Sequence, residues 1–572
     1  MELIPQKVLR QGRERPSTIA YQAKVDGRWQ PTTWSTYAEQ IRTAARALIA
    51  LGLPSGGKVS ILGFNRPEWV ILGHAAMMVG GAPAGIYTTC SPDEVAYIVH
   101  HSESLLVLVE NAEQLAKVRE KKSELPKLQY IVMMRGGSAT GSDVMTWDDF
   151  LAKSAGATDA TLDARIDKID QADLATLIYT SGTTGPPKGV MLSHGNLAWS
   201  AEALNDAAGR PADEISISYL PLSHIAEQMC TMHIPATVGS TVYFAESIDK
   251  LPENIKDCRP TAFFGVPRIW EKFHAGLAGR LAQVTGVKKK LADWARGICT
   301  QINAHRDAGT QPSKALELQY RLATKLVIGK VKAALGFDRA VRLYSGAAPI
   351  APEVLAFMAS LDLPVMEIYG QSEDCGPTAL NLPGKTRMGT VGPAFPGTEV
   401  KLASDGEILI KGPNVFMGYF KDPEATAETL IDGWLHSGDL GAFDKDGFLS
   451  ITGRKKEIII TAGGKNIAPV NIETMIKQLP LVGEAVVIGD RRKYLTALVT
   501  VTEAVPDARA KIQAQIDLAN QQLARVEQVK KFEILDKPFG IDTGELTPTM
   551  KLKRKVIAQK YAAQIEQMYA DE

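Results

Sequence analysis

The sequence predicts an α/β fold with a large N-terminal domain, a small β-rich subdomain and a small α+β C-terminal domain. Short apolar runs such as 58–64 and 104–110 alternate with longer helical patterns such as 67–81, as in stacked, mostly parallel sheets flanked by helices. Short strands and turns dominate from 397 to 460. A chain of 572 residues is also too long for a single hydrophobic core.

The remaining elements follow in chain order. Residues 129–134 and 175–181 read as further buried strands, and residues 272–335 read as a helical excursion with many basic side chains. The charged stretch "GRKKE" then precedes a compact unit with its own strands and helices. We therefore predict an N-terminal domain over 1–453 and a C-terminal domain over 454–572.

Composition limits the kinds of molecule that the protein binds and the compartment in which it is expected. Lysine plus arginine equals aspartate plus glutamate at 64 each, and a net charge of zero argues against bulk binding to nucleic acid. The five cysteines are scattered without a CxxC pair, as in a reducing compartment. The sequence shows no apolar signal core and no run long enough to span a membrane. We expect a cytoplasmic chain, with peripheral membrane contact through the basic excursion left open.

The segment "YTSGTTGPPKG" (179–189) follows a predicted strand and concentrates groups that suit phosphate. It departs from a P-loop, because Pro187 replaces a glycine and Gly189 replaces a serine or threonine around Lys188. Glycines let the backbone approach a ligand, and lysine supplies a point charge. The hydroxyl and glycine residues at its start are Thr180, Ser181, Gly182, Thr183 and Thr184. A short loop of glycine and threonine alone would be interpreted as a surface turn. The complete string of eleven residues is more specific for a phosphate site.

The complete string resembles the phosphate loop of the adenylate-forming superfamily, which includes acyl-CoA synthetases, luciferases and peptide-synthetase adenylation domains. Further segments that resemble this family follow in its order, closest in style to long-chain fatty-acid–CoA ligases. They are "SYLPLSHIAEQ" (218–228), "FFGVPRIWEK" (263–272), "LYSGAAPI" (343–350), "MEIYGQSED" (366–374), "GWLHSGDLG" (433–441), "GRKKEIIITAGGKNIAP" (453–469) and "ELTPTMKLKRK" (545–555). Two positions depart from the usual pattern: Gln228 replaces arginine, and Ser372 replaces threonine.

The resemblance implies a nucleotide site. Tyr369 is implied to stack on adenine, Glu367 to lie at the adenine edge and Ser372 to donate to the α-phosphate. Glu373 and Thr180 are implied to hold Mg²⁺, which prefers oxygen ligands. Lys188 and the loop residues are implied to hold the other phosphates. The further residues implied at the ATP/AMP site are Gly346, Ala347, Gly370, Asp439 and Arg454.

The resemblance also implies the acyl, CoA and hinge positions. Lys551 is implied to be the catalytic lysine, with Ser372, Glu373 and His224 beside it. Lys456 is implied to be the pivot of the C-terminal domain. The implied acyl pocket contains His224, Gly265 and Ala348, and the implied CoA loop contains Gly463, Gly464 and Lys465. Taken alone, each of these residues has an ordinary structural role, such as a core histidine, a turn aspartate or a surface lysine.

The implied activity uses ATP, Mg²⁺ and CoA to convert a medium- to long-chain fatty acid into acyl-AMP and then acyl-CoA. Four alternatives stay open from the sequence. Two keep the chemistry: a ligase that loads a carrier protein, and a CoA ligase for aromatic or branched acids. A P-loop phosphohydrolase lacks its Gly-Lys-[Ser/Thr] string here, and a non-catalytic sensor is expected to lose Lys551 or Glu373. The sequence does not indicate the oligomeric state.

Overall fold

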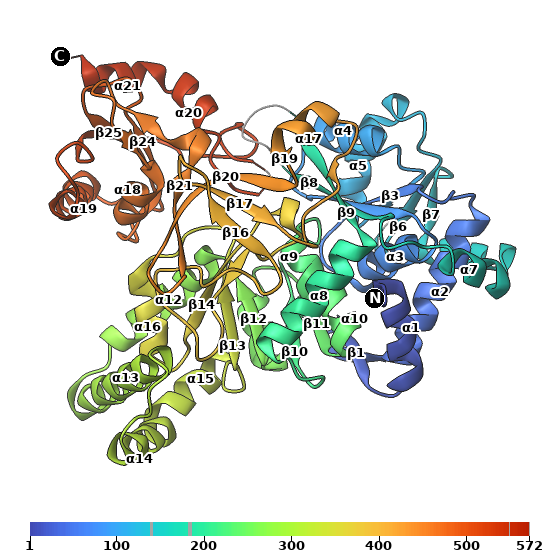
Figure 1. Ribbon diagram of the computed structural model, residues 1–572, viewed down its shortest axis with the longest axis horizontal. Coiled ribbons are helices and arrows are strands. Elements are labelled where there is room, and N and C mark those ends of the chain that lie inside the picture. The colour runs from blue at the N-terminus through green and yellow to red at the C-terminus, as the bar shows by residue number, and fades with distance from the viewer. Residues whose placement is uncertain (138–140, 181–185, 548, 571–572) are drawn as a thin grey trace.

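The computed structural model describes residues 1–137, 141–180, 186–547 and 549–570 (Figure 1). Its largest sheet has eight strands, which are parallel from β8 to β7, with β9 and β18 added antiparallel at one edge. In spatial order these strands are β18 (Gly418–Tyr419), β9 (Lys188–Ser193), β8 (Leu174–Thr180), β4 (Ala82–Ile86), β3 (Lys58–Leu62), β5 (Leu106–Val109), β6 (Tyr130–Met133) and β7 (Val144–Thr146).

Helices cover both faces of this sheet, which explains its continuous apolar strands. In β5, Leu106 and Leu108 join the core that contains the helices α2 and α3, whereas Val107 and Val109 join the core of α4 and α5. Successive side chains of a strand alternate between faces, so every position of this strand is apolar. The covering helices are α2 (Trp34–Ala50), α3 (Pro67–Met78), α4 (Pro92–Ser102), α5 (Ala112–Glu120) and α8 (His194–Ala208).

Two further sheets of four strands stand beside the first. Each is parallel over three strands and closes on one antiparallel edge strand. One contains β10 (Ile215–Ser218), β11 (Thr241–Phe244), β1 (Ile19–Val25) and β2 (Arg28–Thr33). The other contains β12 (Ala262–Gly265), β13 (Arg342–Ser345), β14 (Val365–Tyr369) and β15 (Ala379–Leu380). The helices α11 (Leu251–Cys258) and α16 (Pro352–Ser360) contribute to the apolar core at the second of these sheets.

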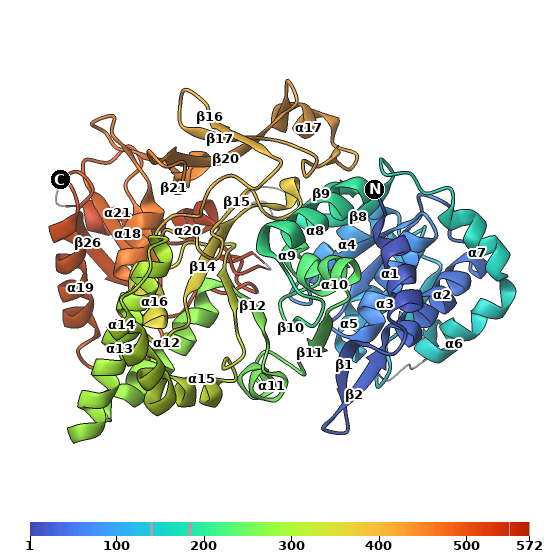
Figure 2. The ribbon, with the colours of Figure 1, turned by 60° about the horizontal axis from the view of Figure 1, so that its bottom comes forward.

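Residues 267–335 form helices, of which α13 and α14 project from the body and lie side by side in both views (Figures 1 and 2). These helices are α12 (Pro267–Ala282), α13 (Gly286–Asp307), α14 (Lys314–Ala323) and, after a π-helical turn at Thr324–Ile328, α15 (Gly329–Leu335). The buried carboxylate of Asp362 ties them to the body. It accepts hydrogen bonds from Arg306 at 2.8 Å, Tyr320 at 2.9 Å and Lys332 at 3.1 Å.

The chain then forms an antiparallel β-rich subdomain and a small α+β unit. The subdomain contains β16 (Glu399–Leu402), β17 (Glu407–Lys411), β20 (Trp434–Phe443), β19 (Leu430–Ile431) and β21 (Leu449–Arg454). The C-terminal unit contains β22 (Ile459–Ile460), β23 (Asn466–Ile467), β24 (Val482–Ile488), β25 (Leu495–Val501) and β26 (Val529–Ile534). Its helices are α18 (Pro469–Ile476), α19 (Ala508–Gln522), α20 (Arg554–Lys560) and α21 (Ala562–Tyr569). Two apolar clusters of its own stabilise it.

These elements confirm the predicted α/β fold class. The remaining helices are α1 (Ile4–Glu14), α6 (Trp147–Ala152), α7 (Asp159–Ile166), α9 (Ile225–Gln228), α10 (Ile234–Val238) and α17 (Pro423–Thr429). Among the described helices, none combines the length and the apolar composition that crossing a membrane requires.

Candidate active site

Three strands bring together the predicted ribose and adenine residues: β14 and β21 at their ends, and β20 at Asp439 in its interior. The Tyr369 hydroxyl, at the end of β14, donates a hydrogen bond of 2.7 Å to Asp439 Oδ2. Arg454 Nε donates to Asp439 Oδ1, also at 2.7 Å, because β20 and β21 pair these two residues directly. The charge of Asp439 is the main cause that raises the pKa of Arg454. An aspartate that already accepts two hydrogen bonds is suited to accept a ribose diol in their place.

Backbone crowding fixes the turn that follows Tyr369. A Cβ at Gly370 would lie 1.4 Å from the Gly376 carbonyl oxygen, so no other residue fits there without moving the chain. The buried Asp374 carboxylate holds this turn by accepting the Gln371 N–H at 2.9 Å and the Thr378 hydroxyl. Burial raises the pKa of Asp374 to about 7.

Ser372 and Glu373 lie on that same turn. Ser372 is buried, and Glu373 Oε1 accepts a 2.8 Å hydrogen bond from the Tyr419 hydroxyl. The ring of Tyr419 also contacts Lys188, whose Nζ lies 4.9 Å from the ring centroid. Tyr419 therefore links the predicted metal residue to the predicted phosphate lysine. Sequence reasoning missed Tyr419 and Asp374, because nothing in "MGYF" indicates a partner for Glu373.

The predicted phosphate loop joins β8 to the antiparallel strand β9. Thr180 pairs with Lys188 across the hairpin and donates a 3.4 Å hydrogen bond to its carbonyl oxygen. Lys188 Nζ lies 4.0 Å from Asp422 Oδ2. The loop residues Ser181, Gly182, Thr183 and Thr184 lie outside the described residues.

The predicted catalytic lysine lies at this site although it belongs to the C-terminal unit. A tight turn holds it: Lys551 N donates to Thr547 Oγ1 at 3.0 Å, and Met550 adopts a left-handed φ of 63°. Burial is the main cause that lowers the Lys551 pKa, and the charge of Arg454 adds to it, whereas Asp439 and Glu373 oppose it. These groups surround Lys551, but its side chain remains accessible to solvent. Solvent screens the charge, so its pKa is lowered less than it would be in a closed interior.

His224 lies near the same lysine, whose charge acts on its ring. Its Nδ1 accepts the Ala226 N–H at 3.2 Å at the start of α9. Burial first, and then the nearby charge of Lys551, lowers the His224 pKa to about 4, so the ring is neutral at pH 7. With Nδ1 acting as acceptor, the ring proton lies on Nε2, which is left as a donor.

Contacts across the two domains hold the C-terminal unit in this position. Arg268 at the start of α12 donates to Glu484 of β24, and Gln478 donates to Glu353 of α16 at 3.0 Å. Both views place the C-terminal unit beside the sheet of β14 (Figures 1 and 2). Lys456, the predicted hinge, is exposed in the turn Lys455–Glu457 that follows β21.

The predicted CoA loop is not part of this cluster. Gly463, Gly464 and Lys465 form the tip of the β22–β23 hairpin, where the Gly464 N–H donates to the Thr461 carbonyl at 2.8 Å. Gly464 has a φ of 73°, and the space around its Cα is open. Among the described residues, no hydrogen bond or ion pair joins this tip to Lys551, Glu373 or Asp439.

The residues predicted to line the acyl pocket and the adenine site are constrained by close packing and by backbone conformation. The side of Gly265 where a Cβ would lie is occupied by Trp270, whose indole Nε1 would be 2.8 Å away. A Cβ at Gly346 would lie 2.8 Å from Ile368 Cγ2, while Ala347 has a φ of 68° and is exposed with Ala348.

Glu367 lies on the same strand as Tyr369. It accepts the Gly389 N–H at 2.9 Å, and burial raises its pKa to about 7. It also lines a cavity of about 10 Å³ with Asp307, Asn381 and Met388.

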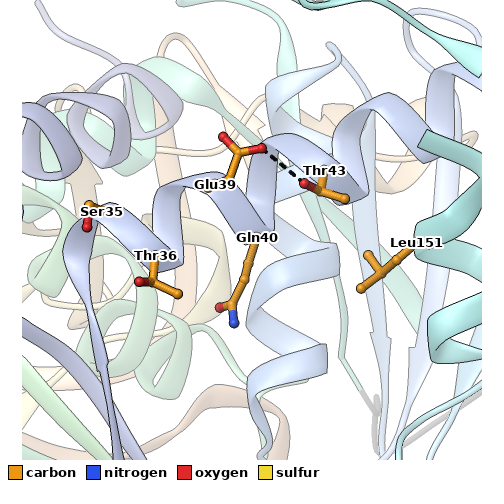
Figure 3. A pocket seen from close by; sticks show the side chains of 6 residues that line it. All are labelled: Ser35, Thr36, Glu39, Gln40, Thr43 and Leu151. Atoms are coloured by element: carbon orange, nitrogen blue, oxygen red, sulfur yellow. Dashed lines mark hydrogen bonds between the residues drawn. The ribbon is translucent and has the colours of Figure 1, made fainter. Parts of the chain in front are cut away.

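A larger surface depression, of about 440 Å³, lies away from these residues on α2 (Figure 3). Its lining contains no predicted site residue, and Glu39 there accepts a hydrogen bond from Thr43 within the helix at 3.2 Å. Its position does not connect it with the nucleotide residues. The lining residues are Ser35, Thr36, Glu39, Gln40, Thr43 and Leu151.

Family models match almost the whole chain. Residues 8–420 match the model of the AMP-binding enzyme family, and residues 456–572 match that of the AMP-binding enzyme C-terminal domain. The long-chain-fatty-acid–CoA ligase ACSBG2 of Xenopus laevis is 38% identical, over 97% of this chain and 82% of that protein. The long-chain-fatty-acid–CoA ligase FadD15 of Mycobacterium tuberculosis is 36% identical, over 98% of this chain and 96% of that protein.

Solved structures share the fold at lower identity. The anthranilate CoA ligase AuaEII in complex with anthranoyl-AMP is 20% identical, with a TM-score of 0.76 over 98% of both chains. The o-succinylbenzoate CoA synthetase MenE of Bacillus subtilis, in complex with ATP and a magnesium ion, is 22% identical, with a TM-score of 0.71 over 96% of this chain and 98% of that chain. The family matches and the relatives together show that this chain belongs to the AMP-binding enzyme family.

Proposed function

We propose that this chain is an AMP-forming long-chain-fatty-acid–CoA ligase. One observation carries the proposal: Lys551 of the C-terminal unit lies among Glu373, Asp439, Arg454 and His224 of the N-terminal domain. A cationic group placed between a nucleotide site and a half-buried, neutral histidine suits the joining of two anions. The named activity of the relatives at 36% and 38% identity supports the fatty acid as the substrate class.

In the first half-reaction, a carboxylate oxygen of the acid bonds to the α-phosphorus of ATP while the bond to the β-phosphate oxygen breaks. Pyrophosphate leaves, and acyl-AMP remains. Lys551 offsets the negative charge shared by the carboxylate and the α-phosphate, and His224 Nε2 can donate a hydrogen bond to the acid. Asp439 exchanges its bonds with Tyr369 and Arg454 for the ribose hydroxyls, and Ser372 donates to the α-phosphate.

The residues at the phosphate end fit Mg²⁺ as a companion of ATP. Protein sites for Mg²⁺ commonly use one or two carboxylates together with substrate phosphates, and Glu373 with the Thr180 hydroxyl provides that donor set. Bound Mg²⁺ would neutralise phosphate charge. No group of three or more acidic, histidine or cysteine side chains among the described residues forms a separate metal site.

In the second half-reaction, the CoA sulfur bonds to the acyl carbonyl carbon while the carbon–oxygen bond to AMP breaks. The thiol proton passes to solvent, and AMP leaves. The CoA loop of Gly463, Gly464 and Lys465 lies outside the Lys551 cluster, so this step requires the C-terminal domain to turn. We place the domain boundary between 453 and 454 and the pivot at Lys456.

The substitution Lys551→Ala tests the assignment through the two half-reactions. We expect acyl-dependent exchange of pyrophosphate into ATP to fall by about 10²–10³-fold, since one charge-stabilising group is lost. Formation of acyl-CoA from supplied acyl-AMP should change little. Lys555→Ala, which removes an exposed lysine from the same segment, is the matched control. Equal loss in both half-reactions would contradict this role.

The acceptor and the acid need a second experiment. We expect CoA- and Mg²⁺-dependent release of AMP with fatty acids, and the rate should rise from short to long chains. Transfer to a carrier protein but not to CoA would favour the acyl-AMP ligase, and a preference for aromatic or branched acids would favour the other CoA ligase. Release of ADP would indicate a phosphohydrolase. The cytoplasmic location stays a prediction.

A further inference from the structure

The outer face of α14 and the following π-helical turn carries a stripe of exposed leucines. Leu318, Leu322 and Leu326 are exposed by 69%, 48% and 40%, and their four-residue spacing aligns them on one side. The opposite side packs inward: Tyr320 and Ala323 belong to a small apolar cluster with α13. The stripe is therefore not needed to bury the core of this helical pair.

A row of basic side chains lies beside the leucine stripe. Lys314 and Arg321 of α14 and Lys325 of the π-helical turn are exposed, and their spacings of seven and four residues place them next to the leucines. Residues 267–335 contain 13 lysines and arginines against four acidic residues, a net charge of +9 in a chain whose total is zero. Residues 267–335 are thus strongly basic, and their helical pair α13–α14 projects from the body (Figure 2).

We propose that the outer face of α14 docks onto an anionic lipid bilayer. A helix with an apolar stripe beside a basic row lies in the membrane interface, with its leucines at the acyl boundary and its cations near the lipid phosphates. Charge decides between the candidate occupants. A second copy of this chain would bring one basic face against another, whereas an anionic surface complements it. The proposal uses none of the residues assigned to ligase chemistry.

Flotation of the full chain with vesicles, without ATP, acid or CoA, tests the docking face directly. We expect binding to vesicles that combine phosphatidylcholine with phosphatidylglycerol and little binding to phosphatidylcholine alone. The triple variant Leu318→Ser, Leu322→Ser, Leu326→Ser should lose at least about tenfold in apparent partition coefficient, because three apolar side chains no longer enter the interface. Its matched control replaces three exposed apolar residues elsewhere: Ile431→Ser, Ile460→Ser and Leu518→Ser.

A variant that removes basic charge measures the electrostatic contribution to vesicle binding. It also tests the proposal if the serine variant folds poorly. Lys314→Gln, Arg321→Gln, Lys325→Gln should also lose about tenfold, and binding of the unchanged protein should weaken as salt rises. Three exposed lysines outside the excursion give the matched control: Lys385→Gln, Lys445→Gln and Lys537→Gln.

Four results would overturn the proposal. They are absence of flotation on anionic vesicles, equal binding to neutral vesicles, equal losses in the control variants, and a dimer in vesicle-free ultracentrifugation that the leucine variant converts to a monomer. The last result would assign the face to self-association. None of these measurements depends on turnover, so their failure is distinct from failure of the proposed ligase activity.

Discussion

Single residues join parts of the site that lie far apart in the sequence, and Tyr419 is the clearest case. Its hydroxyl donates to Glu373 and its ring faces Lys188, so one side chain orients both a predicted metal ligand and a predicted phosphate contact. Partners of this kind fix the orientation of the groups that bind a ligand.

Replacing that hydroxyl alone gives a sharp prediction. In Tyr419→Phe the ring remains, but Glu373 loses a hydrogen bond, so the Mg²⁺ concentration for half-maximal activity at fixed ATP should rise by about tenfold. Magnesium titrations of the initial rate measure this effect, with melting temperature as the control for folding. A titration curve that matches the unchanged protein would show that Tyr419 has no such role.

Three histidines buried away from the site contribute to the dependence of stability on pH. His74, His194 and His233 lie in the N-terminal domain, and burial lowers the pKa of His74 to about 3, of His194 to about 4, and of His233 in the same direction. Neither ring nitrogen of His233 has a hydrogen-bond partner among the described residues.

The sign of the effect follows from these pKa values. Below pH 6.5 these histidines are protonated in the unfolded chain, where their pKa is about 6.5, but stay neutral in the folded protein. Their contribution to the free energy of unfolding is therefore complete above pH 6.5 and declines as pH falls toward about 4. His233→Leu should make the fall in unfolding free energy between about pH 6.5 and about pH 5.5 shallower, by about 1 kcal/mol. Urea unfolding at both pH values measures it. His100→Leu, at an exposed position, is the control, and an equal slope in both variants would contradict this account.

At the scale of elements, the hinge turn Lys455–Glu457 links a strand of the subdomain to the C-terminal unit. Lys455 is held to the β-rich subdomain by ion pairs with Asp405 at 2.6 Å and Glu407 at 3.0 Å. Glu457 forms an ion pair of 3.3 Å with Arg554 of the C-terminal unit. Lys456, between them, is exposed, and no ion pair among the described residues holds it.

Lys456→Pro should separate the two half-reactions. Proline fixes φ and so resists the rotation of the C-terminal domain that the second step requires. We expect pyrophosphate exchange to persist while acyl-CoA formation falls by at least about tenfold. Lys456→Ala removes the same side chain but leaves φ free, and it should behave like the unchanged protein. If proline spares both activities, the pivot lies at another residue.

Across the whole molecule, the sequence predicted best what depends on local pattern. Apolar strands such as β5, the helical excursion and the order of the site segments could be read directly, because alternation and motif spacing are local properties. Tyr369, Asp439 and Arg454 were predicted separately, and the structure brings them into one hydrogen-bonded group.

The parts that could not be predicted depend on packing between distant segments. The partner of Glu373, the occupation of the space beside Gly265 by Trp270 and the contact of Arg268 with Glu484 each join residues of separate elements. Periodicity gives no information on such pairs. The leucine stripe of α14 was equally hidden, because only the packed structure shows which side of a helix stays exposed.

The basic residues of 267–335 also give this chain of zero net charge a permanent separation of charge. The residues outside 267–335 contain 51 basic and 60 acidic side chains, so a body of −9 carries an arm of +9. Such a molecule behaves as an electric dipole, and the field of a charged surface rotates it before contact. The arm would then arrive first at an anionic surface, while the acidic body is held toward the water.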